Sequence, residues 1–295
     1  MAMTEGMVGL LLIYLNGAYL DYSEARLPVD ERGLQFSDGV YEVALVWDGQ
    51  FIDLDRHLVR LERSAAAVEL PLPLTRSEIR AVAEELLRRE NPSRAALYLQ
   101  VTRGVAPRDH RFPAGDVPPT VIVYLKDAPV DEQGLARGVQ AITEPDLRWL
   151  RCDIKSVSLL PNVLARQHAA ARGVREAILV RAGVGVTEGS ATNIWMVRHG
   201  SIVTAPESNW ILSGIVRGVV LELANHENLP VAERFASQEE LMQADEVFLT
   251  STTSFVTPIV EVDGRRIGDG TPGPVTLRLQ ELYMQRLSHL AHFAD

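Results

Sequence analysis

Residues 149–156 have the sequence WLRCDIKS, and their one lysine stands just before a predicted helix. The helical pattern of apolar residues begins near Leu160 and continues through Leu164 to Ala169. Lys155 therefore lies at an element boundary, where a fold can present one side chain to a cavity and where desolvation favours the neutral form of a lysine. A neutral amine attacks aldehydes, so Lys155 is a candidate catalytic residue. Taken alone, the segment fits a solvated surface lysine better.

The composition predicts a globular protein that acts on small molecules. The chain has 295 residues, 46% of them hydrophobic, which is enough for two domains of ordinary size. Its net charge is −10, from 29 basic and 39 acidic residues, and the charges do not gather into long runs of one sign. A nucleic-acid partner and an anionic membrane surface are therefore not expected.

The single cysteine, Cys152, excludes an intrachain disulfide and is typical of a reducing compartment, so we expect a cytoplasmic location. The apolar run at residues 7–15 is too short to span a bilayer, and Glu5 stands where a signal peptide would carry a basic region. We expect an unstructured leader followed by the first strand.

Apolar periodicity and turn residues predict the order of the elements. The pair Asn16-Gly17 favours a hairpin between strands at 11–15 and 18–22, and Ser77 is the expected N-cap of a helix. Further strands are expected at about 40–47, 95–103, 121–125, 139–143, 176–180, 194–197, 201–204 and 246–250. Helices are expected at about 54–68, 77–89, 217–225 and 275–290, besides the one that begins near residue 160. Residues 128–138 mix proline, glycine and charges and are the expected linker between two domains, at 1–129 and 130–295.

Several separated motifs share a resemblance to one family. They are QFSDGVYE at 35–42, QVTRGVAPRDHRFP at 100–113, WLRCDIKS at 149–156, TEGSATN at 187–193 and TSTTS at 250–254. Together they resemble the branched-chain-aminotransferase-like, fold type IV group of pyridoxal-phosphate enzymes. The second and third motifs resemble the D-amino-acid aminotransferases in particular, and the resemblance runs from about residue 16 to residue 280. It implies an α+β fold with a small α/β N-terminal domain and a larger C-terminal domain, in which helices flank a pseudo-barrel sheet.

The resemblance also implies a reaction and its central residues. The expected activity is transamination between D-amino acids and 2-oxo acids, for example D-alanine plus 2-oxoglutarate giving pyruvate plus D-glutamate. Lys155 would hold pyridoxal 5'-phosphate covalently and then move the substrate's α-proton, acting as tether and as acid and base. Glu188 would pair with the pyridine nitrogen and keep it protonated. From the residues alone, Glu188 fits a salt-bridged glutamate at a strand edge equally well.

Other residues are expected to bind the two ends of the reactants. The sequence DRHLVRLERS at 55–64 resembles the family's helix whose arginine binds the cofactor phosphate, which implies this role for Arg60, and a guanidinium offers paired donors to phosphate. Glycine before the helix at 217–225 makes that helix N-terminus an anion site. The remaining cofactor residues implied by the family are Leu212, Ile215, Val216, Ser251 and Thr252. Tyr41, Arg108 and His110 would bind the substrate carboxylate, with the loop of Arg108 and His110 reaching the other subunit of a homodimer. Without the family, Tyr41 fits a core aromatic and the Arg-x-His pair fits a solvated loop.

Three positions depart from the family pattern. Val216 stands where a threonine often contacts phosphate, Ser213 where close relatives often carry lysine, and Ser37 where they often carry glycine. These departures bear on cofactor affinity and rate.

Other functions stay open on the sequence. A 4-amino-4-deoxychorismate lyase or an R-selective amine transaminase would keep Lys155 and Glu188 but lack Arg108 and His110, and the same pair disfavours a branched-chain L-aminotransferase. A protein that binds the cofactor without turnover is a further alternative. A metal hydrolase is disfavoured because the seven histidines show no HxxxH or HExxH spacing.

Overall fold

The computed structural model describes residues 12–292 and divides into two compact units. The first unit holds the described residues up to Pro129, the segment Ile154–Ser158 and the C-terminal residues from Leu290. The second unit holds Val130–Asp153 and Leu159–His289. The expected unstructured leader lies outside the described residues.

A six-stranded antiparallel sheet forms the first unit, in the order β2-β1-β6-β5-β3-β4. Its strands are β1 (Leu12–Leu15), β2 (Ala18–Asp21), β3 (Gly39–Trp47), β4 (Gln50–Ile52), β5 (Arg94–Thr102) and β6 (Thr120–Lys126). Asn16 and Gly17 both have positive φ, which is the backbone that the predicted Asn-Gly turn requires. The predicted hairpin is therefore present.

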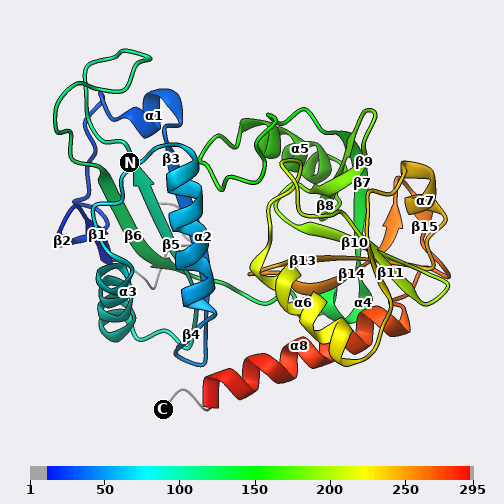
Figure 1. The fold of residues 1–295 in the computed structure, drawn as a ribbon. Helices are drawn as coiled ribbons and strands as arrows, with labels where there is room; N and C mark the ends of the chain where they lie inside the picture. Colours follow the sequence, from blue (N-terminus) through cyan, green and yellow to red (C-terminus); the bar gives the residue numbers. More distant parts are fainter. Residues whose placement is uncertain (1–11, 293–295) are drawn as a thin grey trace. The chain divides into compact units, whose positions relative to one another are not determined.

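Helices cover this sheet, and apolar side chains fill the space between them. α2 (Leu54–Ala67) packs on β3, and α3 (Arg76–Glu90) packs on β1 and β6, while α1 (Arg32–Phe36) precedes β3 (Figure 1). The core includes Leu58, Leu61, Leu86, Leu97 and Leu99, all at most 2% exposed.

The predicted N-cap of α3, Ser77, is wrong, because the cap is Thr75, two residues earlier. Thr75 accepts a bond from the Glu78 backbone N–H, and the Glu78 carboxylate accepts one from the Thr75 N–H at 2.7 Å. This reciprocal capping box needs a glutamate at the third helical position, which the cap at Thr75 has in Glu78.

The segment that carries Lys155 belongs to the first unit although its flanking chain belongs to the second. The Tyr41 N–H donates to the Lys155 carbonyl at 3.0 Å, and the Val157 N–H donates to the Gly39 carbonyl at 3.1 Å. Ile154, at 6% exposed, lies in the core of the first unit. The start of β3 therefore fixes the backbone of Lys155.

The second unit contains a mixed nine-stranded sheet, in the order β12-β11-β10-β13-β14-β7-β8-β9 with β15 paired to β14. Its strands are β7 (Val139–Pro145), β8 (Glu176–Arg181), β9 (Gly185–Gly189), β10 (Asn193–Arg198), β11 (Ser201–Thr204), β12 (Val231–Glu233), β13 (Glu246–Ser251), β14 (Phe255–Val262) and β15 (Arg265–Arg266). β7 pairs parallel with both β8 and β14. The sheet curls into a half-barrel (Figure 1) around a core that includes Ile178, Ile194, Val247 and Ile259.

Helices flank the curled sheet (Figure 1). They are α4 (Glu132–Arg137), α5 (Leu160–Ala171), α6 (Ile215–His226), α7 (Gln238–Met242) and α8 (Pro274–His292). α5 packs on β7 and β8 through small residues such as Ala165 and Ala169, and α6 packs on β13. Two expectations need correction. The predicted linker contains α4, capped by Asp131, and α6 begins at Ile215, because Gly214 is its N-cap.

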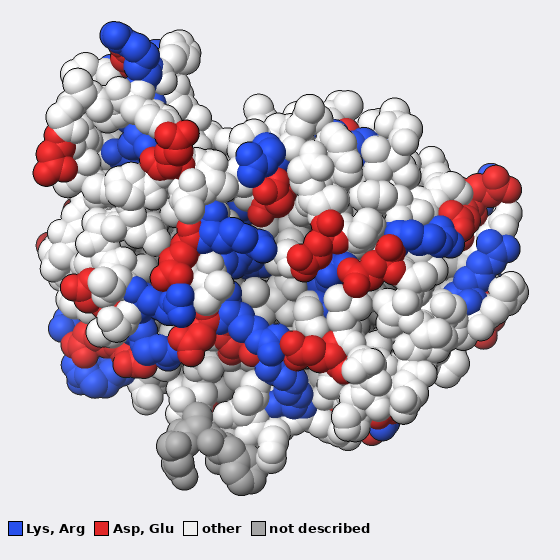
Figure 2. All heavy atoms as spheres, in the orientation of Figure 1, with Lys and Arg blue, Asp and Glu red and all other residues white. Residues whose placement is uncertain are grey.

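Surface charge on this protein is mixed. On the face shown in Figure 2, basic and acidic side chains are interspersed, and neither sign forms a continuous patch there. Within residues 12–292, no helix has both the length and the apolar character needed to cross a bilayer.

Candidate active site

Lys155 is partly buried beside Tyr41 in the first unit. Its Nζ lies 4.2 Å from the centroid of the Tyr41 ring, a cation–π distance. Its backbone N–H donates to the Ser64 hydroxyl on α2 at 3.2 Å, and its carbonyl accepts from Tyr41. Two elements thus hold the lysine backbone, while its side chain extends along an aromatic face.

Glu42, His57 and Arg60 form a buried cluster in the same unit. The Glu42 carboxylate accepts from Arg60 Nε at 2.7 Å and from an Arg60 terminal nitrogen at 2.9 Å, and His57 Nδ1 lies 2.8 Å from it. Burial opposes ionisation of Glu42, but the Arg60 guanidinium and His57 hold its pKa well below the ordinary value. Burial lowers the pKa of His57, so its ring is neutral near pH 7 and donates from Nδ1. The bidentate pair fixes the orientation of Arg60.

Arg108 and His110 are exposed on the loop between β5 and β6. Both contact Phe36: the Arg108 Cζ is 4.6 Å from the Phe36 ring centroid, and the two ring centroids of His110 and Phe36 are 5.3 Å apart. The neighbouring Arg111 is paired with Asp109 at 2.6 Å. Among residues 12–292, Arg108 has no ion pair, so its guanidinium can donate hydrogen bonds to an anionic ligand.

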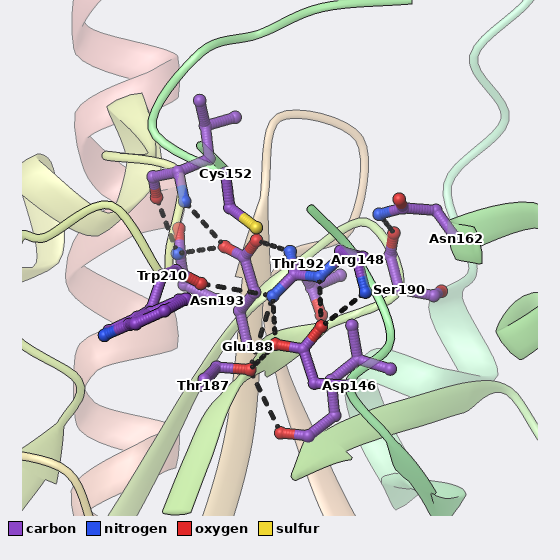
Figure 3. A network of polar contacts seen from close by, with 12 residues as sticks. Asp146, Arg148, Cys152, Asn162, Thr187, Glu188, Ser190, Thr192, Asn193 and Trp210 are labelled. Atoms are coloured by element: carbon purple, nitrogen blue, oxygen red, sulfur yellow. Dashed lines mark hydrogen bonds and ion pairs between the residues drawn. The ribbon is translucent and has the colours of Figure 1, made fainter. Parts of the chain in front are cut away.

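Glu188, on β9 in the second unit, is a buried carboxylate surrounded by donors (Figure 3). Its Oε1 accepts from Arg148, and its Oε2 accepts from the Leu212 N–H at 2.9 Å and from the Asn193 side-chain amide at 3.3 Å. Burial raises the pKa of Glu188, while Arg148 and the Leu212 N–H act in the opposite direction. A carboxylate balanced in this way can exchange a proton or hydrogen bond with a basic ring nitrogen.

Arg148 is itself fixed by Asp146. Their side chains share two hydrogen bonds, at 2.9 and 2.8 Å, and Arg148 also donates to the Trp210 carbonyl at 3.1 Å. Asp146 pairs in addition with Arg181 at 3.0 Å and accepts from the Thr187 hydroxyl at 2.8 Å. Burial opposes the ionisation of Asp146, but Arg148 makes its pKa lower than usual. Figure 3 shows Arg148 between Asp146 and Glu188, so Glu188 has a cationic neighbour whose orientation Asp146 fixes.

Cys152 lies against this network without taking part in acid–base chemistry. Its Sγ is 3.3 Å from the Trp149 carbonyl oxygen. Burial raises the pKa of the thiol to about 11, so it stays protonated at neutral pH.

Asn193 connects Glu188 to the N-terminus of α6. Besides its bond to Glu188, its side-chain amide donates to the Leu212 carbonyl at 2.9 Å. A Cβ at Gly214 would lie 2.1 Å from the Asn193 Oδ1, so this approach requires glycine. Gly214 caps α6 without a side-chain hydrogen bond, so it does not occupy the first amides of the helix, at Ile215 and Val216.

Ser251 and Thr252 stand at the end of β13, next to the same region. Thr250 lies directly opposite Asn193 in the register of β10 and β13. Ser251 and Thr252 are both partly buried, and the Ser251 hydroxyl accepts the Ser254 N–H at 3.0 Å. The backbone of Ser251 and Thr252 therefore continues β13 beside the Asn193 end of β10.

Comparison with known proteins shows which family this chain belongs to. The family model described as amino-transferase class IV matches residues 39–262. The chain belongs to the class IV aminotransferases. This aminotransferase is 42% identical to a D-alanine aminotransferase of Staphylococcus haemolyticus over 91% of its own length and 95% of the relative's. A D-alanine aminotransferase of Bacillus licheniformis is also 42% identical, over 91% of this chain and 94% of the relative.

Solved structures of the class are similar throughout. The T.th. branched-chain amino acid aminotransferase with pyridoxamine 5'-phosphate has a TM-score of 0.88 at 29% identity, covering 96% of this chain and 95% of that one. A branched-chain aminotransferase from Thermoproteus uzoniensis with norvaline has a TM-score of 0.85 at 28% identity, covering 95% of each chain. The expected fold type IV architecture and the resemblance to D-amino-acid aminotransferases are confirmed.

This class IV aminotransferase uses pyridoxal phosphate, and its donor set fits that cofactor. The first unit supplies a primary amine on a fixed backbone and an oriented guanidinium, which suit an aldehyde and a phosphate. The second unit supplies a buried carboxylate and a helix N-terminus without a side-chain cap, which suit a ring nitrogen and a phosphate.

The predicted site residues fall into two sets. The first unit holds Tyr41, Arg60, Arg108, His110 and Lys155, and the second holds Glu188, Leu212, Ile215, Val216, Ser251 and Thr252. Within the second set, the Leu212 N–H contacts Glu188 directly, and Asn193 connects Glu188 to the α6 N-terminus.

Sequence reasoning did not single out Glu42, His57, Arg148 or Asn193 as site residues. Glu42 and Asn193 lie inside two of the quoted motifs, so their position there was an available signal. Arg148 precedes its motif by one residue and offers no such signal.

Proposed function

We propose that this aminotransferase transfers the amino group between D-amino acids and 2-oxo acids, with D-alanine and 2-oxoglutarate as a substrate pair. The observation that carries the proposal is the exposed Arg108 guanidinium, which has no ion pair among residues 12–292 and lies beside His110. The relatives named D-alanine aminotransferase support it at 40–42% identity, whereas the branched-chain structures quoted above are 28–29% identical.

Pyridoxal phosphate, when bound, supplies an aldehyde that accepts the amino group and a ring that withdraws electrons from Cα. We infer that Lys155 binds the aldehyde carbon and, once displaced by substrate, carries the α-proton away from Cα. The bonds from Tyr41 and to Ser64 fix the lysine backbone, so only the side chain has to move between these tasks.

Glu188 is inferred to hold a proton at the ring nitrogen. Burial strengthens this interaction because water is excluded, and Arg148 prevents Glu188 from becoming too strong a base. The donors from Leu212 and Asn193 set the direction of the carboxylate. The carboxylate is therefore pre-oriented before cofactor binds.

The phosphate is assigned to Arg60, to the amides of Ile215 and Val216, and to the hydroxyls of Ser251 and Thr252. Leu212 is assigned to the cofactor as well. Val216 contributes its N–H only, since its side chain has no hydroxyl. Glu42 supports Arg60 in this role because the bidentate pair fixes the guanidinium plane.

Tyr41, Arg108 and His110 are assigned to the substrate carboxylate. Arg108 suits a carboxylate because its terminal nitrogens can donate two parallel hydrogen bonds. We further infer a homodimer in which the loop of Arg108 and His110 serves the site of the second copy. A cytoplasmic location is also inferred, from the single buried thiol.

The test is the absorbance of the bound cofactor when single amino acids are added to the holoenzyme. D-alanine is expected to bleach the visible band, while L-alanine and L-leucine leave it unchanged. Conversion by L-leucine alone would favour a branched-chain L-aminotransferase, the class of the structural neighbours. A band that no amino acid converts would fit a cofactor-binding protein without turnover. Lys155→Ala serves as the control, because its cofactor should leave on gel filtration.

A further inference from the structure

The loop that carries Arg108 and His110 is firmly attached at its base. The Arg32 N–H donates to the Gly104 carbonyl at 2.9 Å, and the Ala106 N–H donates to the Asp30 carbonyl at 3.2 Å. A Cβ at Gly104 would lie 2.2 Å from the Pro118 carbonyl oxygen, so the two ends of the loop pass in close contact. The base of the loop is therefore preorganised by the backbone.

Arg103 strengthens the same base. Its guanidinium donates to the carbonyls of Val68 and Glu69 at 2.7 and 2.8 Å and pairs with Asp38 at 2.9 Å. Its Cζ lies 3.7 Å from the centroid of the Phe112 ring, farther along the loop. None of these contacts of Arg103 involves Arg108 or His110, the loop residues assigned to the substrate carboxylate.

Arg32 of α1 binds the middle of the loop, at Asp109. Arg32 is only 3% exposed, and its Nε pairs with Asp38 at 2.8 Å while a terminal nitrogen donates to the Asp109 carbonyl at 2.7 Å. Asp109 is the residue between Arg108 and His110, so this bond fixes the backbone on which both side chains stand.

Phe36, the last residue of α1, fixes the side chains themselves. Its ring contacts Arg108 at 4.6 Å, Arg32 at 4.8 Å and the His110 ring at 5.3 Å, measured to centroids. The face of an aromatic ring attracts cations without supplying an anion. Phe36 can therefore hold Arg108 in place and leave its hydrogen-bond donors for a ligand.

The carboxylates near Arg108 form ion pairs with other arginines. Asp109 pairs with Arg111, and Asp38 pairs with both Arg32 and Arg103. Because none of these carboxylates pairs with Arg108, the apolar ring is what positions this guanidinium.

We propose that Phe36 is a positioning residue for the substrate carboxylate, acting through Arg108 and His110 with the help of Arg32. The inference rests on the proposed function, in which those two side chains bind the carboxylate. Phe36 touches neither Lys155 nor the residues assigned to the cofactor in any described contact. It should therefore govern the affinity for amino acid and oxo acid and leave cofactor binding unchanged.

The experiment compares Phe36→Ala with Leu34→Ala in the holoenzyme. Leu34 lies on the same helix, is 72% exposed and makes no side-chain contact with the loop among the contacts described, so it is a matched apolar truncation. Phe36→Ala is expected to raise the KM for D-alanine about 10-fold, as for a loss of ~1.4 kcal/mol of binding, with kcat within about 3-fold. Phe36→Tyr, which keeps the ring, should restore KM, and Leu34→Ala should match the unchanged enzyme.

A second readout does not depend on turnover. Trypsin should cut the Arg111–Phe112 bond in Phe36→Ala at least about 5-fold faster than in Leu34→Ala, because a loop released from α1 samples cleavable conformations more often. The affinity for pyridoxal phosphate should be the same in both variants.

Arg108→Gln distinguishes the role of Phe36 from the role of Arg108 in binding the substrate carboxylate. If Phe36 acts through Arg108, the double variant should raise KM little beyond Arg108→Gln alone. If Arg108→Gln raises KM while Phe36→Ala matches Leu34→Ala in both KM and proteolysis, the role of Phe36 is overturned and the proposed function stands. If Arg108→Gln leaves KM unchanged, the carboxylate assignment fails, and the role of Phe36 in substrate binding fails with it.

Discussion

Replacing Arg148 with methionine should destabilise the second unit far more than the same replacement of a surface arginine does. Arg148 is 7% exposed and makes two hydrogen bonds to Asp146 and one to Glu188. Methionine fills similar space but leaves the Glu188 carboxylate buried without its cation, while Asp146 keeps Arg181. Breaking a buried pair in this way costs about 3–5 kcal/mol of unfolding free energy.

The cost should depend on pH, with a sign that follows from Glu188. Burial already raises the pKa of Glu188, and loss of Arg148 removes an influence that lowers it. In the variant the folded state therefore binds a proton that the unfolded state releases above its pKa of about 4.3. Stability must then fall as pH rises from about 5 toward the folded pKa. The deficit should be smaller at pH 5.5 than at pH 8.

The assay is urea unfolding of the cofactor-free protein, followed by tryptophan fluorescence. Three of the four tryptophans, Trp149, Trp195 and Trp210, belong to the second unit. A loss of ~3–5 kcal/mol corresponds to a midpoint lower by about 1–2 M at the usual urea dependence. The control is Arg234→Met, which removes an exposed pair with Glu240 in the same unit and should move the midpoint far less than Arg148→Met does.

Glu188→Gln, added to Arg148→Met, should recover part of the loss because the unpaired charge is gone. A deficit below about 1 kcal/mol, equal at both pH values, would refute the claim that Arg148 compensates a buried charge.

Three further predictions concern stability. Ser37→Gly should add about 0.5–1 kcal/mol in urea unfolding, because Ser37 has φ of 55°, where a Cβ is strained; a loss of stability would show that its side chain contributes instead. Burial lowers the pKa of His57, so between pH ~6.5 and pH 5 only the unfolded histidine takes up a proton, and the unfolding free energy falls as pH falls. His57→Asn should make this fall less steep. An unchanged slope would show that other groups cause the pH dependence. Glu246→Ala should cost about 1–2 kcal/mol, because the carboxylate caps α8 at the N–H groups of Val275 and Thr276; a circular-dichroism melt identical to that of the unchanged protein would contradict this.

Local patterns in the sequence predict most of the fold. The Asn16-Gly17 turn and most of the strands and helices that carry the core were expected near their observed bounds, because each depends on neighbours in sequence. The strand β14 was not expected, although its Ile259 lies in the core of the second unit. Errors occurred where two local signals compete. Ser77 and Thr75 are both capping types, and only the distance to Glu78 decides between them. Six residues of the predicted linker form α4, because Asp131 caps them.

The candidate site shows a sharper division. Motifs led to the prediction of Lys155, Glu188 and Arg108 as site residues, because each lies in a characteristic stretch of chain. Their surroundings were not predictable, because they come from distant residues: Arg148 meets Glu188 across 40 positions. A single sequence gives no measure of such pairing.

The return of residues 154–158 to the first unit has a consequence for how this protein can be made and recombined. A chain cut after Pro129 lacks Ile154 from its core and the hydrogen bonds that the start of β3 makes with this segment. During synthesis, the first unit therefore cannot complete its packing until residue 158 has left the ribosome. Chimaeras that exchange the first unit between relatives should carry this five-residue segment along with it.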